Sequence, residues 1–327
     1  MAGLLAGPEF VRRYGDRVAA LVCATGADLE PIALPADPAA RLDRAATERI
    51  ELAYFSGDIH PTWSASFFAA AFSADKLRWV HCFNAGTDHP IFARLLERGV
   101  RLTNSPGASA VPIAHSAIAA LLALARRLPR FGAAQRERCW LEAGAVAPPL
   151  DLAGQTLVVV GLGGIGGEIA RLARALGMRV VGVRRSAARE DLRADELVPP
   201  ARLREVLPRA DWLALACPLT DETRGWIDAA ALALLPDGAH VINVARGEIV
   251  DERALTAELQ SGRIAGAYLD VFEVEPLPGD SPLWALPNVI VTPHAAALSA
   301  GNQARQAELF LANLARWARG EPLANAV

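Results

Sequence analysis

Three polar side chains in the second half of the chain are suited to the reduction of a carbonyl group. Arg246, Glu275 and His294 each follow an apolar stretch that is typical of a buried strand. A guanidinium group can hold a carboxylate through forked hydrogen bonds and polarise a neighbouring carbonyl. An imidazole can give a proton to the developing alkoxide, and a carboxylate beside it fixes its tautomer. Together the three residue types predict hydride transfer to a 2-oxo acid.

Taken singly, none of the three residues is diagnostic. An isolated arginine or glutamate is usually a solvated surface group, and an isolated histidine is usually an ordinary hydrogen-bonded residue. Their common position after predicted strands makes a functional role more plausible, because ligands of open α/β sheets bind beyond the carboxyl ends of the strands. We therefore expect Arg246, Glu275 and His294 to converge on one site.

A glycine-rich motif predicts that a dinucleotide binds. Residues 161–166 read G-x-G-x-x-G, between an apolar run at 157–160 and a helical pattern at 168–176. In this context the glycines allow a tight turn, close approach of the backbone to a pyrophosphate and packing of helix on strand. The helix N-terminus adds N–H groups and the positive end of its dipole. The residues predicted to hold the phosphates are Gly161, Gly163, Gly164, Ile165 and Gly166.

The end of the next predicted strand bears on the choice of coenzyme. An acidic residue about 20 positions after the glycines would accept hydrogen bonds from the ribose 2′-hydroxyl of NAD. In its place the chain has Arg184 and Arg185, followed by Ser186. Guanidinium groups favour a 2′-phosphate, so we expect a preference for NADP (NADPH). The alternative is that both arginines extend into solvent and NAD is used with a looser ribose contact.

Strands and helices alternate along the chain, which predicts parallel βαβ units. The alternation is clear over residues 157–292 and weaker in the first hundred residues, where Pro31, Pro35 and Pro38 are expected in a loop. The fold class that follows is α/β, with two Rossmann-like doubly wound parallel sheets. The predicted strands are residues 50–55, 77–82, 100–103, 157–160, 179–183, 212–216, 240–244, 265–271 and 289–292, and the predicted helices are 108–128, 168–176, 203–207, 228–235, 252–259 and 300–319.

The position of the glycine motif predicts how the domains are arranged. At 327 residues the chain is long for one hydrophobic core, so two domains are expected. About 150 residues precede the motif, and a last helix follows the final strand of the nucleotide-binding region. We expect a dinucleotide-binding domain at 108–294, inserted into a discontinuous substrate domain at 1–107 and 295–327.

Composition excludes several other functions. The net charge of −3 gives no reason to expect nucleic acid or an anionic membrane as partner. Four scattered cysteines suggest reduced, mostly buried thiols with neither a metal site nor a disulfide framework. The longest apolar run, 117–125, is too short to span a bilayer and no signal sequence is visible, so a cytoplasmic location is expected. Lys76 is the only lysine, which argues against a Walker A loop or a Schiff base.

On these motifs the chain resembles the D-isomer-specific 2-hydroxyacid dehydrogenase family. The resemblance rests on residues 161–167, 218–224, 243–251, 269–278 and 292–295, which occur in the family's order. It implies that Arg246 binds the substrate, that His294 is the acid/base with Glu275 as partner, and that the protein forms a homodimer on its nucleotide domain. Substrates of this family include small acids such as glyoxylate, hydroxypyruvate and pyruvate. The further coenzyme contacts that it implies are Cys217, Pro218, Thr223, Val244, Ala245 and Asp270, and the further substrate contacts are Ala85, Gly86 and Thr87.

One departure from the family's pattern leaves a role open. His115 and Ser116 stand where the family commonly has an acidic residue followed by a histidine or an aromatic residue. His115 is either a second titrating group or, as we expect, a helix-packing or hydrogen-bonded residue. Two alternative functions are a nucleotide-sensing protein that resembles certain corepressors, and an enzyme that resembles alanine dehydrogenase or homocysteine hydrolase. The presence of Arg246, Glu275 and His294 argues against the first, and the placement of Lys76 argues against the second.

Overall fold

The computed structural model describes residues 1–87, 89–142, 144–185 and 193–327. The chain divides into two compact units, Met1–Ser109 with Ser299–Val327, and Ala110–Leu298. Each unit is an α/β body built on its own parallel sheet, which confirms the predicted fold class. Ser186, predicted to contact the coenzyme, lies outside the described residues.

The first unit is built on a five-stranded parallel sheet in the order β2-β1-β3-β4-β5. Short apolar strands buried on both sides are typical of a parallel sheet covered by helices. The prediction that Pro31 lies in a loop is wrong, because it lies in β2, an edge strand where a missing N–H is tolerated. The strands are β1 (Ala2–Ala6), β2 (Leu29–Ala33), β3 (Ile50–Phe55), β4 (Trp79–Cys82) and β5 (Arg101–Thr103).

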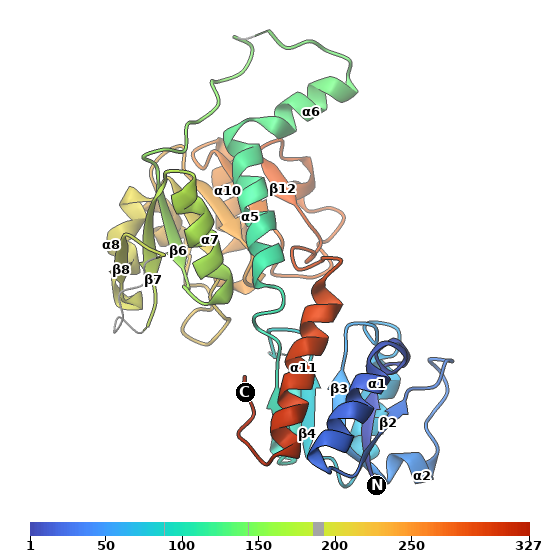
Figure 1. Cartoon of the computed structure of the whole chain (residues 1–327). Coiled ribbons are helices and arrows are strands. Elements are labelled where there is room, and N and C mark those ends of the chain that lie inside the picture. The colour runs from blue at the N-terminus through green and yellow to red at the C-terminus, as the bar shows by residue number, and fades with distance from the viewer. Residues whose placement is uncertain (88, 143, 186–192) are drawn as a thin grey trace. The chain divides into compact units, whose positions relative to one another are not determined.

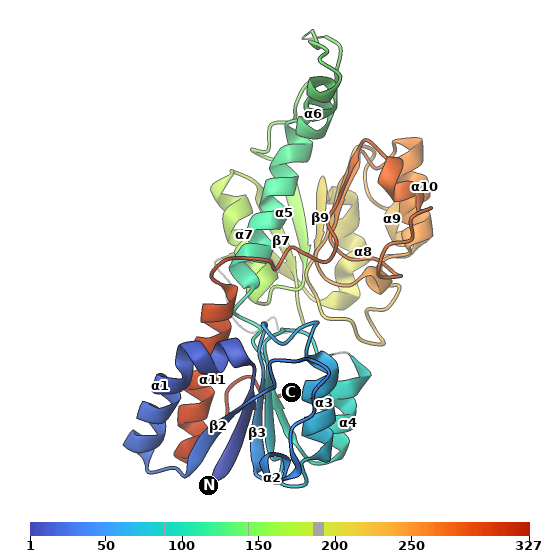
Figure 2. The same ribbon diagram turned by 90° about the vertical axis from the view of Figure 1, so that its right-hand side faces the viewer.

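Helices cover both faces of this sheet. Figure 2 shows α1 and α11 on one face and α3 and α4 on the other. Phe310 of α11 stacks on Tyr54 of β3 with ring centroids 4.3 Å apart, so the last helix of the chain belongs to the core of the first unit. The helices are α1 (Pro8–Thr25), α2 (Arg44–Thr47), α3 (Ser64–Ser73), α4 (Pro90–Glu97) and α11 (Asn302–Ala318).

The second unit is built on a seven-stranded parallel sheet in the order β12-β11-β10-β9-β6-β7-β8. The strand order reverses between β6 and β9, and such a reversal opens a crevice at the carboxyl ends of the strands. The strands are β6 (Thr156–Val160), β7 (Arg179–Val183), β8 (Glu196–Val198), β9 (Trp212–Leu215), β10 (His240–Asn243), β11 (Gly266–Leu269) and β12 (Val289–Val291).

Helices also cover both faces of the second sheet (Figure 1). α5 and α7 pack on one face, and α8, α9 and α10 pack on the other. The predicted helix 108–128 is shorter than expected, because Arg127 adopts a left-handed φ of 59° and α6 then leaves at an angle of 72° to α5. The helices are α5 (Ala110–Ala125), α6 (Leu128–Arg136), α7 (Gly164–Ala175), α8 (Leu203–Val206), α9 (Ala229–Ala233) and α10 (Glu252–Ser261).

Two histidines are buried in the sheets and have structural roles. Burial lowers the pKa of His81 to about 3 and that of His240 to about 4, so both stay neutral at physiological pH. His81 Nδ1 lies 2.6 Å from the Thr103 hydroxyl, and His240 stacks on Trp212 with ring centroids 4.1 Å apart. Neither is placed to act as an acid or base on a substrate.

The cysteines are divided between buried and exposed positions. All four cysteines are free; Cys82 and Cys217 are buried, but Cys23 and Cys139 are exposed, so the prediction of mostly buried thiols is only half right. Among the described residues no single helix is long and apolar enough to cross a membrane. The bent pair of α5 and α6, with 72° between the two helices, reaches that length and apolar composition only when the two are taken together.

Candidate active site

The glycine motif forms a loop whose three motif glycines meet different surroundings. Gly161 has a φ of +94°, and a Cβ there would lie 2.7 Å from the Cα of Cys217. A Cβ on Gly166 would lie 1.9 Å from the Gly161 carbonyl oxygen. Gly163, by contrast, has nothing within 4 Å of its missing Cβ and caps α7 without a side-chain hydrogen bond. Backbone packing therefore demands the first and third glycines, whereas the second opens onto free space.

This loop fits the phosphates of a dinucleotide. Open space beside a helix N-terminus lets an anion approach backbone N–H groups and the positive end of the dipole. Cys217, two residues after the end of β9, packs against Gly161, so the loop lies where the strand order reverses. Gly163, Gly164 and Ile165 are the residues that would hold the pyrophosphate. Burial raises the pKa of the Cys217 thiol to about 11, which keeps it protonated.

Two segments near the ends of β7 and β9 contain the other predicted coenzyme contacts. Arg184 is half-buried and its amide donates to the Val198 carbonyl at 3.1 Å, while Arg185 is exposed. A hydrogen bond from Thr220 lowers the pKa of Glu222, and the charge of Arg185 adds to this shift. Arg185 therefore lies near the loop after β9. In that loop the Thr223 hydroxyl donates to the Pro218 carbonyl at 2.8 Å.

Arg246 follows β10 in a turn that its neighbours shape. The Asn243 side chain accepts from the amide of Ala245 at 3.1 Å and donates to the Arg246 carbonyl at 3.0 Å. Arg246 Nη1 donates to the carbonyl of Ala245 at 2.7 Å. A Cβ on Gly247 would lie 1.8 Å from the backbone of Phe272, so only glycine allows this turn to touch the loop after β11. Val244 and Ala245 are buried beneath the turn.

His294 and Glu275 form a pair at the ends of β12 and β11. Nδ1 of His294 lies 2.8 Å from Oε2 of Glu275, and the side chains are 48% and 36% exposed. The other carboxylate oxygen of Glu275 accepts from the Phe272 amide at 3.1 Å. An ionised carboxylate only accepts, so Nδ1 has the hydrogen and Nε2 is left to face a substrate. The pair can therefore hold an oriented imidazole that exchanges a proton at Nε2.

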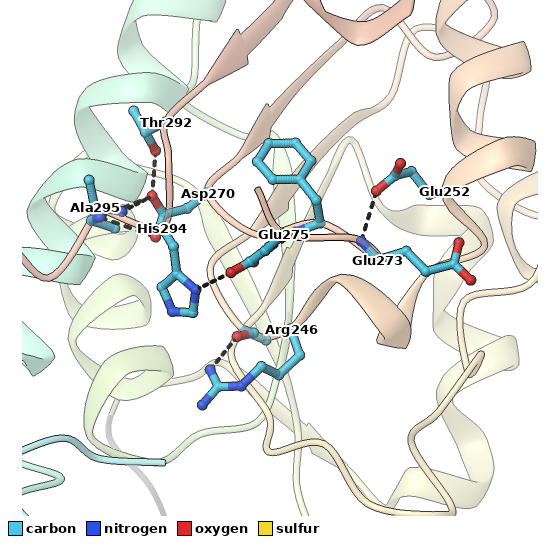
Figure 3. Close-up of polar contacts among 11 residues, drawn as sticks. Arg246, Glu252, Asp270, Glu273, Glu275, Thr292, His294 and Ala295 are labelled. Carbon is cyan, nitrogen blue, oxygen red and sulfur yellow. Dashed lines mark hydrogen bonds and ion pairs between the residues drawn. The ribbon is translucent and has the colours of Figure 1, made fainter. Parts of the chain in front are cut away.

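The turn that carries His294 is tied to Asp270. Asp270 is buried, and its carboxylate accepts from the amides of Ala295 at 2.8 Å and Ala296 at 3.0 Å and from the Thr292 hydroxyl. Figure 3 shows the His294 and Glu275 side chains directed at each other, with Asp270 bound to the same turn. The predicted contact of Asp270 with a nicotinamide stays a prediction.

The structure thus brings together the residues predicted on three neighbouring strands. β12, β11 and β10 are adjacent and parallel, so His294, Glu275 and Arg246 all follow carboxyl ends at one edge of the sheet (Figure 3). Thr292, Tyr268 and Ser116 form the group that holds His294. The sequence left the role of Ser116 open and predicted no role for the hydroxyl groups of Thr292 and Tyr268. Tyr268 Oη lies 2.9 Å from Thr292 Oγ1, and Ser116 Oγ donates to the Ala296 carbonyl at 3.2 Å.

The predicted substrate contacts of the first unit lie on an ordered turn after β4. Asn84 Nδ2 donates to the Gly86 carbonyl, and Asn104 Nδ2 donates to the Ala85 carbonyl, both at 2.5 Å. Ala85, Gly86 and Thr87 are partly exposed, as carboxylate binding by backbone amides requires. Their role in binding the substrate stays a prediction.

Two doubly wound sheets, a phosphate-binding glycine loop and an Arg–Glu–His set at strand ends define a dinucleotide-dependent oxidoreductase. The family model of the D-isomer specific 2-hydroxyacid dehydrogenase NAD binding domain matches residues 118–296. The chain belongs to the D-isomer specific 2-hydroxyacid dehydrogenase family. It is therefore an NAD(P)-dependent enzyme that interconverts a 2-oxo acid and a D-2-hydroxy acid.

Sequence relatives and solved structures agree with this assignment. The chain is 39% identical over 251 residues to a glyoxylate reductase of Korarchaeum cryptofilum, an alignment that covers 76% of this chain and 75% of the relative. A D-isomer specific 2-hydroxyacid dehydrogenase of Xanthobacter autotrophicus in complex with NADPH and MES is 34% identical, with a TM-score of 0.74 and coverage of 100% and 98%. An NADPH-dependent glyoxylate/hydroxypyruvate reductase of Sinorhizobium meliloti in complex with citrate is 30% identical, with a TM-score of 0.78 and the same coverage.

Proposed function

We propose that the protein reduces a small 2-oxo acid, such as glyoxylate or hydroxypyruvate, with NADPH as preferred coenzyme. The observation that carries the proposal is the His294–Glu275 pair at 2.8 Å, with Arg246 at the end of the next strand. The names of the relatives in Korarchaeum cryptofilum and Sinorhizobium meliloti support this class of substrate.

The residues of the site divide the work. A bound nicotinamide would supply the hydride for reduction of the substrate carbonyl. Arg246 grips the substrate carboxylate and polarises the adjacent carbonyl through its planar fork. His294 donates a proton from Nε2 to the oxygen that becomes an alkoxide, and accepts it in the reverse direction. Glu275 holds the tautomer and the orientation of His294 through the hydrogen bond at Nδ1. Ala85, Gly86 and Thr87 are proposed to contact the substrate through backbone amides.

The coenzyme preference is expected to depend on Arg185. In wild type, kcat/KM with NADPH should exceed that with NADH, and Arg185→Ala should lower the NADPH value about 10-fold, the effect of one hydrogen bond to a charged group. The NADH value should change by less than about twofold, since NAD has no 2′-phosphate. The measurement is the oxidation of both coenzymes against a panel of a dozen 2-oxo acids.

A matched control uses a second exposed arginine. Arg17 pairs with Glu308 on the surface of the first unit, so Arg17→Ala removes the same charge from a unit that contains none of the predicted coenzyme contacts. A kcat/KM of the wild type with NADH equal to or above that with NADPH would contradict the proposed coenzyme preference. No turnover of any 2-oxo acid with either coenzyme would contradict the proposed function as a whole.

We also propose that the chain forms a homodimer through α6 and the segment that follows it. α6 extends away from the sheet of its unit (Figure 1), and Leu128, Phe131 and Trp140 are exposed, with Trp140 86% exposed. A contiguous exposed apolar patch marks an interaction surface, and Leu128 and Phe131 are three residues apart and so lie on one face of α6. Wild type should sediment as a dimer and Phe131→Glu with Trp140→Glu as a monomer. A monomeric wild type at micromolar concentration would refute the dimer.

A further inference from the structure

The backbone of His294 adopts a conformation that must be held in place. Its φ is 51°, in the left-handed region that residues with a Cβ enter only at a cost. Such a residue persists where its surroundings over-determine it, and such residues cluster at functional sites. The direction of the imidazole therefore depends on the contacts that fix this turn.

Asp270 supplies most of these contacts. The amide of His294 donates to the Asp270 carbonyl at 2.8 Å, and the amides of Ala295 and Ala296 donate to its carboxylate. The Thr292 hydroxyl donates to the same carboxylate oxygen that Ala295 uses. Residues on both sides of His294 are thus bound to one buried group at the end of β11.

The hydroxyl groups around Asp270 form a chain whose polarity is determined. An ionised carboxylate only accepts, so the single hydrogen of the Thr292 hydroxyl is committed to Asp270. Tyr268, 2.9 Å from Thr292 and 2% exposed, must then be the donor to the Thr292 oxygen. Burial raises the pKa of Tyr268, which keeps this donor protonated. Ser116 of α5 binds the Ala296 carbonyl and so ties the far side of the turn to a helix.

We propose that the hydroxyl groups of Tyr268 and Thr292 are positioning groups for the reaction: acting through Asp270, they hold the left-handed turn that aims the His294 imidazole. The proposal rests on the proposed acid/base role of His294. It assigns to Tyr268, a residue buried in the sheet, an effect on turnover and not on the binding of substrate or coenzyme.

The size of the effect follows from the geometry of proton transfer. A misplacement of about 1 Å can cost up to about 100-fold in rate. Removal of the Thr292 hydroxyl leaves a buried carboxylate with one donor fewer, so we expect kcat to fall about 10-fold. Removal of the Tyr268 hydroxyl acts one bond further away, and we expect about a 3-fold fall. KM and the Kd of NADPH should stay within about twofold, because neither hydroxyl touches the glycine loop or Arg246, and the Asp270 carboxylate keeps its bonds to the amides of Ala295 and Ala296.

The test compares substitutions that differ in one hydroxyl. Thr292→Val removes the hydroxyl at nearly constant volume and Thr292→Ser retains it, while Tyr268→Phe removes the second hydroxyl and keeps the ring. Thr256→Val in α10 and Tyr14→Phe in α1 are the matched controls, since the Thr256 hydroxyl bonds only its own helix and Tyr14 packs in the first unit. For each variant we would measure kcat and KM for the fastest 2-oxo acid, the Kd of NADPH and Tm.

The expected result is a low kcat in Thr292→Val and Tyr268→Phe, recovery in Thr292→Ser, and unchanged controls. The proposal is overturned if Thr292→Val and Tyr268→Phe turn over like wild type, or if Thr292→Ser loses as much kcat as Thr292→Val. If Thr292→Val fails to fold, Tyr268→Phe alone decides. Retained turnover in His294→Ala would refute the role of His294 itself, whereas an inactive His294→Ala beside fully active hydroxyl variants would refute only the positioning role.

Discussion

His294→Ala is expected to lower kcat about 10³-fold, within the range that a positioned general acid contributes. Nδ1 of the His294 imidazole lies 2.8 Å from Glu275, so Nε2 is the nitrogen that can give a proton to the substrate or accept one from it. Without it, the alkoxide formed from the carbonyl must take its proton from water. Glu275→Gln should have a smaller effect, about 10- to 100-fold, because the imidazole stays in place but its tautomer is no longer enforced.

Coenzyme binding separates this effect from a general loss of structure. His294 is held by Asp270 and Glu275, whereas the glycine loop is built from β6, α7 and Cys217. The Kd of NADPH in His294→Ala, measured by fluorescence titration, should therefore equal that of wild type within about twofold. His60→Ala, a change at an exposed histidine with no predicted role in the site, is the matched control and should keep kcat. Turnover of 2-oxo acids by His294→Ala at the wild-type rate would remove this residue from the acid/base role.

The second half of the fold could be predicted from the sequence because its strands are strong local signals. Those that were predicted are short apolar runs, most of them followed by a helical pattern, and the predicted bounds of β7 match the observed ones. β1, β2 and β8 were missed for physical reasons. β1 contains small residues, β2 contains Pro31, and β8 is a strand of only three residues at the edge of its sheet. Pairing across the sheet, not local propensity, determines such strands.

The predicted site shows a similar division. Arg246, Glu275 and His294 could be found because their residue types match a reaction and each follows a strand. The network that holds His294 could not, since it depends on the left-handed φ of one residue and on the burial of Tyr268. The sequence around Asn243 did carry a signal, because asparagine commonly closes a turn with its own side chain, as it does ahead of Arg246.

Arg246→Ala is expected to lower kcat/KM for the 2-oxo acid about 10³-fold. Two hydrogen bonds from a charged fork, at about 1.5–3 kcal/mol each, account for an effect of this size. KM should rise because the carboxylate is no longer gripped, and kcat should fall because the carbonyl is no longer polarised. The Kd of NADPH should change little, which distinguishes loss of the clamp from loss of the fold.

Arg246→Lys tests whether the fork, and not only the charge, is required. Lysine keeps the positive charge but presents it as a point on a flexible chain, so we expect it to recover only about 10-fold of the loss. The turn itself should survive both substitutions, because Asn243 bonds to the backbone of residue 246 and Gly247 sets the approach to Phe272. The measurement is the steady-state kinetics of wild type, Arg246→Ala and Arg246→Lys with one 2-oxo acid. Equal kcat/KM in wild type and Arg246→Lys would show that charge alone suffices, and unchanged kinetics in Arg246→Ala would place the carboxylate clamp elsewhere.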